Sequence, residues 1–240
     1  MRTPHEPRLA HVAAMVADAT RARMLSYLLS GELACASELA SAATVTPATA
    51  SGHLSKLVDA GLLVCEQRGR HRYFRLADAD VAHALEALAL VAERDAHDQT
   101  WRSPERQRLR AARTCYGHLA GRLGVGLFDK AQADGWLQPA PQGLMLTAQA
   151  VQALVRWGFE GQSWVERMQS APAKRWLYPC LDWSERKDHL AGPFANALLT
   201  HFLAQGWVRR RDGERAIELT PKGLLPLGHL TKRNPDAISA

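Results

Sequence analysis

Apolar residues recur at helical spacing along the first sixty positions and predict four helices. The first two carry apolar stripes before Gly31, on Leu9, Val12, Ala13, Val16, Met24, Leu25, Leu28 and Leu29. A short third helix is expected within residues 37–45, "SELASAATV". The fourth is expected to begin after Thr46, whose hydroxyl is a good N-cap, with Pro47 in its first turn and Gly61 at its end.

The fourth helix has an outward face that differs from an ordinary solubilising surface. Its inward stripe is apolar, and its other positions are small, hydroxylic or basic, with no acid before Asp59. Small residues allow close approach to a duplex, and hydroxyls, imidazole and amine groups reach phosphates and base edges. The pattern predicts a helix-turn-helix with this helix in the major groove. The predicted contacts are Thr46, Thr49, Ser51, His53 and Lys56.

Two strand-like runs follow in residues 62–77, on either side of an Arg-Gly-Arg sequence. A hairpin tip with two arginines beside a glycine suits a contact with the DNA backbone or minor groove. We therefore expect Arg68, Arg70 and His71 to contact DNA from this wing. The alternative is an ordinary solvated hairpin.

A long amphipathic helix is predicted directly after the hairpin, within residues 78–97. Its apolar stripe, Val81, Leu85, Leu88 and Val91, has no evident partner inside so small a domain. A dimer interface would bury this stripe.

Composition and charge agree with a nucleic-acid partner. The 240 residues are 47% apolar, the net charge is +6 and the sequence pI is about 9.4, so polyanions are favoured, with nucleic acid ranked above an anionic membrane surface. No apolar run reaches the roughly 18 residues of a membrane span, and no apolar signal core opens the chain. We therefore expect a cytoplasmic protein without a membrane partner. Its scattered cysteines are expected to be reduced: Cys35, Cys65, Cys115 and Cys180.

Three segments resemble the ArsR-type (arsenic-repressor-like) winged-helix regulators, in the order expected for that family. They are "ADATRARMLSYLL" at 17–29, "SELASAATVTPATASGHLSKLVDAGLL" at 37–63 and "RGRHRYFRLA" at 68–77. The resemblance covers about residues 8–98. It implies a homodimer joined through the helices near 8–19 and 78–98. It also implies repression by binding a double-stranded DNA operator, with release by an effector.

The sequence departs from the metal-sensing members of that family. Their paired thiolates before the recognition helix are reduced here to Cys35, and one thiolate cannot chelate a soft ion alone. Those members also carry carboxylate and imidazole ligands on the last helix of the dimer, and Asp80 and His83 do not reproduce that pattern. We therefore expect no metal site in this domain, and we expect Cys35 and Cys65 to be small buried apolar residues.

An internal repeat occupies the second half of the chain. Residues 118–136 and 189–207 share eight identities in a gapless alignment of nineteen positions, and each segment continues into a hairpin and an "LT" pair. The repeat predicts two further helix-and-wing units, at about 115–155 and 180–227. The alternative is chance similarity between short helices rich in Ala and Leu.

These patterns predict a mainly α protein with small β-hairpins. A winged helix-turn-helix domain for DNA binding and dimerisation would occupy residues 1–98, and a linker 99–112. A second, α+β, effector-sensing domain built from the two repeated helix-and-wing units would occupy residues 113–240.

Each repeat opens with a histidine, and a cysteine lies shortly before that histidine in the chain. Pseudo-symmetric packing of the two units would bring these side chains together. The candidate residues for an effector or redox site are Cys115, Tyr116, His118, Cys180, Asp182, Trp183 and His189. Such a group suits a pocket for a small organic effector, then a redox thiol pair, then a metal site, in that order of preference. The alternative is local packing without a ligand.

The sequence thus predicts a dimeric transcriptional repressor, released by a small-molecule or thiol-reactive signal sensed in the second half. No cofactor is assigned. The alternatives are a metal-responsive repressor using Cys115, His118, Cys180 and His189, a DNA-binding domain fused to a Cys-His enzyme, and an architectural DNA binder. We expect no enzyme, because phosphate-loop, dinucleotide-loop, HExxH and GxSxG patterns do not occur.

Overall fold

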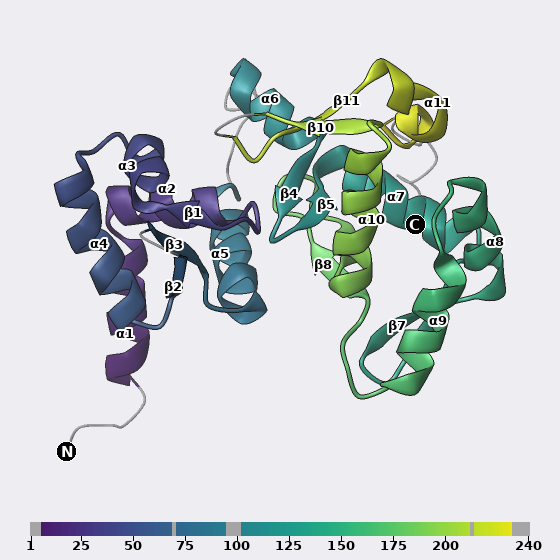
Figure 1. Cartoon of the computed structure of the whole chain (residues 1–240), viewed down its shortest axis with the longest axis horizontal. Coiled ribbons are helices and arrows are strands. Elements are labelled where there is room, and N and C mark those ends of the chain that lie inside the picture. Colours follow the sequence, from purple (N-terminus) through teal and green to yellow (C-terminus); the bar gives the residue numbers. More distant parts are fainter. Residues whose placement is uncertain (1–5, 69–70, 95–101, 212–213, 232–240) are drawn as a thin grey trace. The chain divides into compact units, whose positions relative to one another are not determined.

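The computed structural model describes residues 6–68, 71–94, 102–211 and 214–231 (Figure 1). The chain divides into two compact units, Met1–Leu85 and Glu86–Ala240. The division falls inside helix α5 (Ala79–Ala92), which therefore begins in the first unit and ends in the second. The domain boundaries expected at residues 98 and 112 stay predictions.

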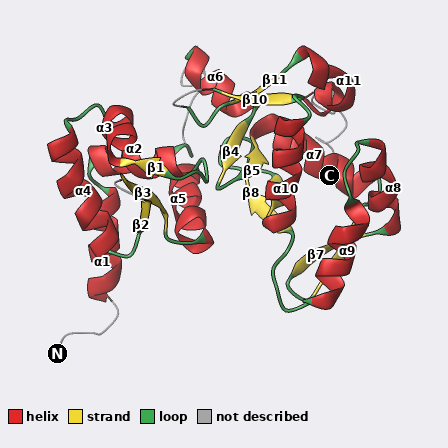
Figure 2. Ribbon diagram, in the orientation of Figure 1, coloured by secondary structure: helices red, strands yellow, loops and turns green. Residues whose placement is uncertain are grey.

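The N-terminal unit is a winged helix-turn-helix, as the sequence predicts (Figure 2). A three-stranded antiparallel sheet in the order β1-β3-β2 accompanies its helices. The elements that precede α5 are α1 (Glu6–Val16), α2 (Ala19–Leu28), β1 (Ala34–Cys35), α3 (Ala36–Ala43), α4 (Pro47–Asp59), β2 (Leu63–Arg68) and β3 (His71–Leu76).

Helix caps and apolar stripes explain these helices. Asp18 caps α2 by accepting a 2.9 Å hydrogen bond from the amide of Arg21. Thr46 caps α4 in the same way, accepting a 3.2 Å bond from the amide of Thr49. The stripes predicted on α2 and α4 face the core, which includes Met24, Leu25, Leu28, Leu54, Leu57, Phe74 and Leu76. The stripe predicted on α1 does not, since Leu9 and Val12 are exposed. Cys35 and Cys65, expected to be buried, are both only half-buried, because one caps α3 and the other lies on the wing strand β2.

The C-terminal unit begins with the second part of α5 and continues through short helices and two-stranded hairpins. Helix α6 lies within the expected linker. The elements are α6 (Pro104–Ala111), β4 (Arg113–Cys115), β5 (His118–Ala120), α7 (Gly121–Ala133), β6 (Leu137–Ala140), β7 (Gly143–Leu146), α8 (Ala148–Arg156), α9 (Gly161–Ser170), β8 (Tyr178–Leu181), β9 (Asp188–Ala191), α10 (Pro193–Ala204), β10 (Val208–Arg210), β11 (Ile217–Leu219), η2 (Pro221–Gly223), α11 (Leu224–Leu227) and η3 (Gly228–Thr231).

The same order of elements occurs twice in this unit: hairpin, helix, hairpin, short helix. Equivalent hydrogen bonds recur with the same lengths. The hydroxyl of Thr147 donates to the carbonyl of Gly135 over 2.7 Å, and that of Thr220 donates to Gly206 over 2.7 Å. The structure therefore contains the repeated helix-and-wing units.

Each repeat starts on a strand rather than on a helix. His118 and His189 lie on strands β5 and β9. The helices begin three or four residues later, because Gly121 and Gly192 adopt φ values of +74° and +100° and turn the chain from strand to helix. Each unit consequently has an extra hairpin before its helix, and these two hairpins carry the candidate site.

Candidate functional site

Helix α4 presents most of its predicted contact residues to solvent. Thr46, Thr49, Ser51 and Lys56 are exposed, and the hydroxyls of Thr46 and Thr49 are hydrogen-bonded to each other at 2.9 Å. His53 differs, because its side chain is only 19% exposed and its Nδ1 lies 3.6 Å from Oδ1 of Asp18. The outward face of α4 is therefore formed by small and hydroxylic residues together with Lys56.

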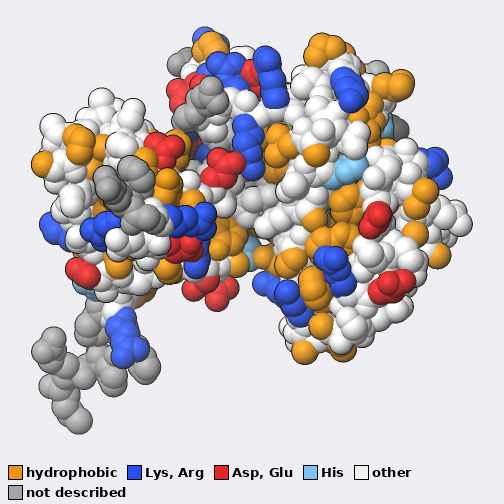
Figure 3. All heavy atoms as spheres, viewed as in Figure 1, with side chains coloured by type: hydrophobic (Ala, Val, Ile, Leu, Met, Phe, Trp, Pro, Cys, Tyr) orange, Lys and Arg blue, Asp and Glu red, His pale blue; other side chains and the backbone are white. Residues whose placement is uncertain are grey.

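The wing hairpin β2–β3 has the predicted register, from Leu63 opposite Leu76 to Arg68 opposite His71. Arg68 is 61% exposed and pairs with Glu66 at 3.1 Å. Glu66 also binds Arg75, and hydrogen bonds from Arg75 and then Arg68 lower its pKa. Arg70 and the side chain of His71 lie outside the described residues. On the face shown in Figure 3, basic and acidic side chains are interspersed. The positions of individual basic side chains therefore say more about a DNA contact than the net charge of the protein does.

Four side chains from two hairpins converge in the C-terminal unit. Cys115 is the register partner of His118 in β4–β5, and Cys180 is the register partner of His189 in β8–β9. Register partners project from the same face of a hairpin, which explains each pair. One ligand atom from each residue lies within 4.8 Å of the others, and all four residues are buried. We call these four residues the Cys–His cluster.

Asp182 follows β8 and is fully buried beside the Cys–His cluster. One of its oxygens lies 3.2 Å from Nδ1 of His189 and accepts a 2.7 Å hydrogen bond from the amide of Gly121. The other accepts a 2.7 Å bond from the hydroxyl of Ser184 and lies 3.0 Å from the guanidinium of Arg113. These contacts fix the carboxylate, and the carboxylate in turn orients the ring of His189.

Arg113, the first residue of β4, is also fully buried. Its guanidinium lies 3.0 Å from Asp182, 3.9 Å from Glu86 on α5 and 4.5 Å from the ring centroid of Trp183. Glu86 pairs in addition with Arg215, which donates a 3.0 Å hydrogen bond to the carbonyl of Thr114. The strand that carries Cys115 is thus joined to α5 by buried ion pairs.

Burial and neighbouring groups shift the pKa values of the two histidines in opposite directions. Burial lowers the pKa of His189, but the contacts with Asp182 and Cys180 outweigh it and raise this pKa to about 9. Burial lowers the pKa of His118 by more than the contact with Cys180 raises it. The contact with Cys180, together with burial, raises the pKa of the Cys115 thiol well above its usual range. The protonated imidazolium form is therefore favoured on His189 and disfavoured on His118.

The aromatic candidates take different positions. Trp183 is buried against Arg113, whereas Tyr116 is half-buried in the turn between β4 and β5, with φ of +48°.

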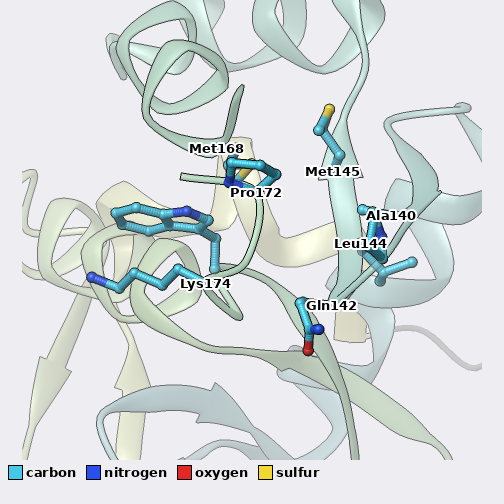
Figure 4. Close-up of a pocket in the computed structure, with 9 residues that line it drawn as sticks. Ala140, Gln142, Leu144, Met145, Met168, Pro172 and Lys174 are labelled. Carbon is cyan, nitrogen blue, oxygen red and sulfur yellow. The ribbon is translucent and has the colours of Figure 1, made fainter. Parts of the chain in front are cut away.

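A pocket of about 270 Å³, partly open to solvent, lies elsewhere in this unit, between the β6–β7 turn and the segment after α9 (Figure 4). Its lining includes Met168, Pro172 and Lys174 and none of the Cys–His cluster.

Comparison with known proteins assigns the chain to a family. A helix-turn-helix domain model matches residues 16–66. The uncharacterized HTH-type transcriptional regulator YdfF of Bacillus subtilis (strain 168) is 36% identical over 217 residues, which cover 90% of this chain and 94% of that protein. The chain belongs to the HTH-type transcriptional regulators. The prediction of a helix-turn-helix transcriptional regulator is confirmed.

Other relatives match a smaller share of this regulator. The HTH-type transcriptional regulator CmtR of Mycobacterium tuberculosis (strain ATCC 25618 / H37Rv) is 38% identical over 86 residues, 36% of this chain and 72% of that protein. The NMR structure described as the cadmium metal-sensor CmtR is 36% identical, covers 35% of this chain and 85% of that one, and gives a TM-score of 0.31. Among the described residues of this regulator, no helix has the length and apolar character needed to cross a bilayer.

The buried ionic residues of this regulator are the part of the site that sequence reasoning missed. Arg113, Glu86 and Ser184 were assigned no role, because arginine and glutamate are exposed by default and Arg113 directly follows a polar, linker-like stretch. No pattern in the sequence identifies them, because the burial of Asp182, which requires a cationic partner, becomes visible only in the folded chain.

Proposed function

We propose that this regulator is a dimeric repressor that places α4 in the major groove of double-stranded DNA. Its wing, β2–β3, contacts the backbone, and its C-terminal unit receives the signal that releases it. The observation that carries the proposal is the exposed face of α4, where Thr49, Ser51 and Lys56 are accessible and no acid occurs before Asp59. Such a face approaches phosphates and base edges without repulsion.

Exposed apolar residues support the dimer. Leu9 and Val12 on α1 are 75% and 37% exposed, and Leu88 and Val91 on α5 are 51% and 56% exposed. They belong to the two helices near 8–19 and 78–98 that the family resemblance assigns to the dimer interface. A second copy of the chain would remove this apolar surface from water.

The Cys–His cluster supports a signal-receiving role for the C-terminal unit. Its thiol and imidazole groups are potential metal ligands, its two thiols could form a disulfide on oxidation, and its neighbours connect it to α5 through Arg113 and Glu86. Because all four side chains are buried, the cluster suits reception of a small ion or oxidant better than catalysis on an organic substrate. This observation changes the order expected from the sequence, which favoured a small organic effector.

The test is binding of the full-length protein to duplexes from its own upstream region, measured by fluorescence anisotropy over a range of salt concentrations. Arg70→Ala is expected to weaken binding to all sequences and to reduce the salt slope by about one charge. Thr49→Ala is expected to relax sequence preference instead.

The matched control is Arg156→Ala, which removes an exposed arginine from α8. It is expected to leave both affinity and salt slope unchanged. Equal salt slopes for Arg70→Ala and wild type would exclude the wing contact. Failure of the wild type to bind any duplex at low salt would exclude the proposed function as a whole.

A further inference from the structure

We propose that Cys115, His118, Cys180 and His189 bind one four-coordinate thiophilic cation, of the Zn²⁺ type, that joins the two repeats of the C-terminal unit. The proposal rests on the signal-receiving role proposed above and names its ligand class. Metal binding and DNA binding are measured separately, so the two proposals can fail independently.

The donor set and its geometry point to a tetrahedral ion. Zn–S and Zn–N bonds of about 2.3 and 2.0 Å place tetrahedral ligand atoms roughly 3.3–3.8 Å apart. The four ligand atoms of the Cys–His cluster already lie within 4.8 Å of one another, and Nε2 of His118 is 3.1 Å from Nε2 of His189. Small side-chain rotations would therefore complete the coordination. Two thiolates and two imidazoles form a donor set typical of closed zinc sites.

The backbone holds the four donors in position. Each cysteine faces its histidine across a hairpin, and the short β4–β5 turn of Tyr116 and Gly117 fixes one pair. At Gly124 of α7 a Cβ would lie 2.4 Å from the carbonyl oxygen of Leu119 and 3.5 Å from Cβ of His189. Helix α7 thus packs closely behind both histidine-bearing strands, and the donors lie on a framework with little freedom to move apart.

The surroundings of His189 are those of a metal ligand. Asp182 lies 3.2 Å from Nδ1, which leaves Nε2 directed toward the Cys–His cluster. Metal-bound histidines commonly place their second nitrogen against a carboxylate in this way, and such a carboxylate is itself held by hydrogen bonds. Asp182 is held by the amide of Gly121, the hydroxyl of Ser184 and the guanidinium of Arg113.

A redox thiol pair accounts for less of this arrangement. A disulfide between Cys115 and Cys180 would use two of the four converging groups and would assign no role to the imidazoles or to the carboxylate behind one of them. None of the four cysteines, all of which lie among the described residues, forms a disulfide. A metal ion uses all four groups and binds them as thiolates and neutral imidazoles, so its binding releases protons.

The experiment uses the full-length protein, reduced, treated with chelator and titrated anaerobically with Co²⁺ and then Zn²⁺. The expected result is one Co²⁺ per chain, with the visible bands of tetrahedral cobalt and thiolate charge-transfer bands, all removed by one equivalent of Zn²⁺. Zn²⁺ is also expected to raise the unfolding temperature, because it binds only the native site. Octahedral cobalt spectra, or Zn²⁺ without effect on unfolding, would overturn the proposal.

Variants identify the ligands. Cys180→Ser and His118→Gln are each expected to weaken Co²⁺ binding at least tenfold, and Cys180→Ser to reduce the charge-transfer intensity by about half. Cys65→Ser is the matched control, because it removes a thiol from the wing strand β2 and leaves the Cys–His cluster intact. If the cluster variants fail to fold, the wild-type charge-transfer intensity decides, since two thiolates must contribute. An intramolecular disulfide in protein purified without reductant, with no metal bound after reduction, would assign the pair to redox chemistry.

DNA binding separates the two proposals. We expect Zn²⁺ to change the dissociation constant for the upstream duplex by about tenfold, within the usual range of coupling between two sites. Tight Zn²⁺ binding without any change in DNA affinity would leave the metal site standing and refute its role as signal. Zn²⁺ binding by a protein that ignores DNA would refute the proposed function and leave the metal site standing.

Discussion

Nε2 of His118 lies 3.1 Å from Nε2 of His189, although the two residues are 71 positions apart in the chain. They occupy equivalent positions in the two repeats, on β5 and β9. At this distance two imidazolium ions would repel each other, so one proton between them is favoured. The repeats have diverged here: Asp182 contacts His189 and raises its pKa, whereas burial lowers the pKa of His118.

Asp182→Asn is expected to destabilise the C-terminal unit by about 3 kcal/mol, because it leaves the buried guanidinium of Arg113 facing a neutral amide. It is also expected to weaken the proposed Zn²⁺ site by about 10–100-fold, through loss of the carboxylate that orients His189. Urea denaturation and Co²⁺ titration measure the two effects.

The control is Asp129→Asn, which neutralises a carboxylate that is 52% exposed and 3.7 Å from Lys187. Exposed pairs contribute about 0–1 kcal/mol, so little change is expected. If Asp182→Asn were no more destabilising than this control, the buried ion pairs would not hold the site together.

Gly124→Ala is expected to destabilise the protein by about 1–3 kcal/mol, because the added methyl would lie 2.4 Å from the carbonyl oxygen of Leu119. Gly52→Ala on α4 is the matched control, since no heavy atom lies within 4 Å of its built Cβ. This control is expected to be stabilising by about 0.5–1 kcal/mol, from helix propensity alone. Chemical denaturation compares the two, and equal effects would exclude the close approach of α7.

Acid is expected to weaken the N-terminal unit through Asp18. A hydrogen bond from the amide of Arg21, with the charges of Arg21 and His53, lowers the pKa of this carboxyl below its unfolded value. The ionised form is therefore favoured in the folded state, and its stabilisation is present at neutral pH and lost as the pH falls below about 4.

Asp18→Asn isolates this contribution, because asparagine caps helices about as well as aspartate but carries no charge. The difference in unfolding free energy between wild type and Asp18→Asn is expected to shrink toward zero below about pH 4. Asp18→Ala, which removes the cap as well, is expected to be less stable at every pH. A constant difference between wild type and Asp18→Asn would show that charge is not involved.

The N-terminal unit was predictable from sequence because its signals are local. The cap at Thr46, the terminating Gly61 and the strand-like runs on either side of the Arg-Gly-Arg sequence each act within a few residues. The three-stranded sheet was harder to predict from the sequence, because β1 has only two residues and pairs with β3 almost forty positions later. Such a short strand leaves no periodic pattern to detect.

The Cys–His cluster could be predicted from the sequence only because the repeat was recognised. Pairing equivalent residues of two homologous units placed the four side chains together, without any local metal motif. The strands that carry them were missed, since three- and four-residue strands that lead into an apolar helix resemble its first turn. The ionic residues behind the cluster depend on tertiary contacts between Glu86, Arg113 and Asp182, which no spacing in the sequence reveals.

Glu86→Gln is expected to uncouple the Cys–His cluster from α5. Glu86 lies on this helix and pairs with Arg113 and Arg215. Arg113 belongs to β4, the strand that carries Cys115, and Arg215 donates a hydrogen bond to Thr114 of the same strand. Since α5 is one continuous helix that begins in the N-terminal unit, a shift of β4 on metal binding would reach that unit through Glu86. Removing this charge should leave the cluster able to bind Co²⁺ but reduce the effect of Zn²⁺ on DNA affinity.

The measurement is the ratio of dissociation constants for the upstream duplex with and without Zn²⁺. In Glu86→Gln this ratio is expected to fall from about ten toward one, with the tetrahedral Co²⁺ spectrum unchanged. Glu93→Gln is the control, because it neutralises a carboxylate that pairs with Arg106 rather than with the residues beside the cluster. A full Zn²⁺ effect in Glu86→Gln would place the coupling elsewhere, because a buried carboxylate that transmits the signal cannot be neutralised without loss.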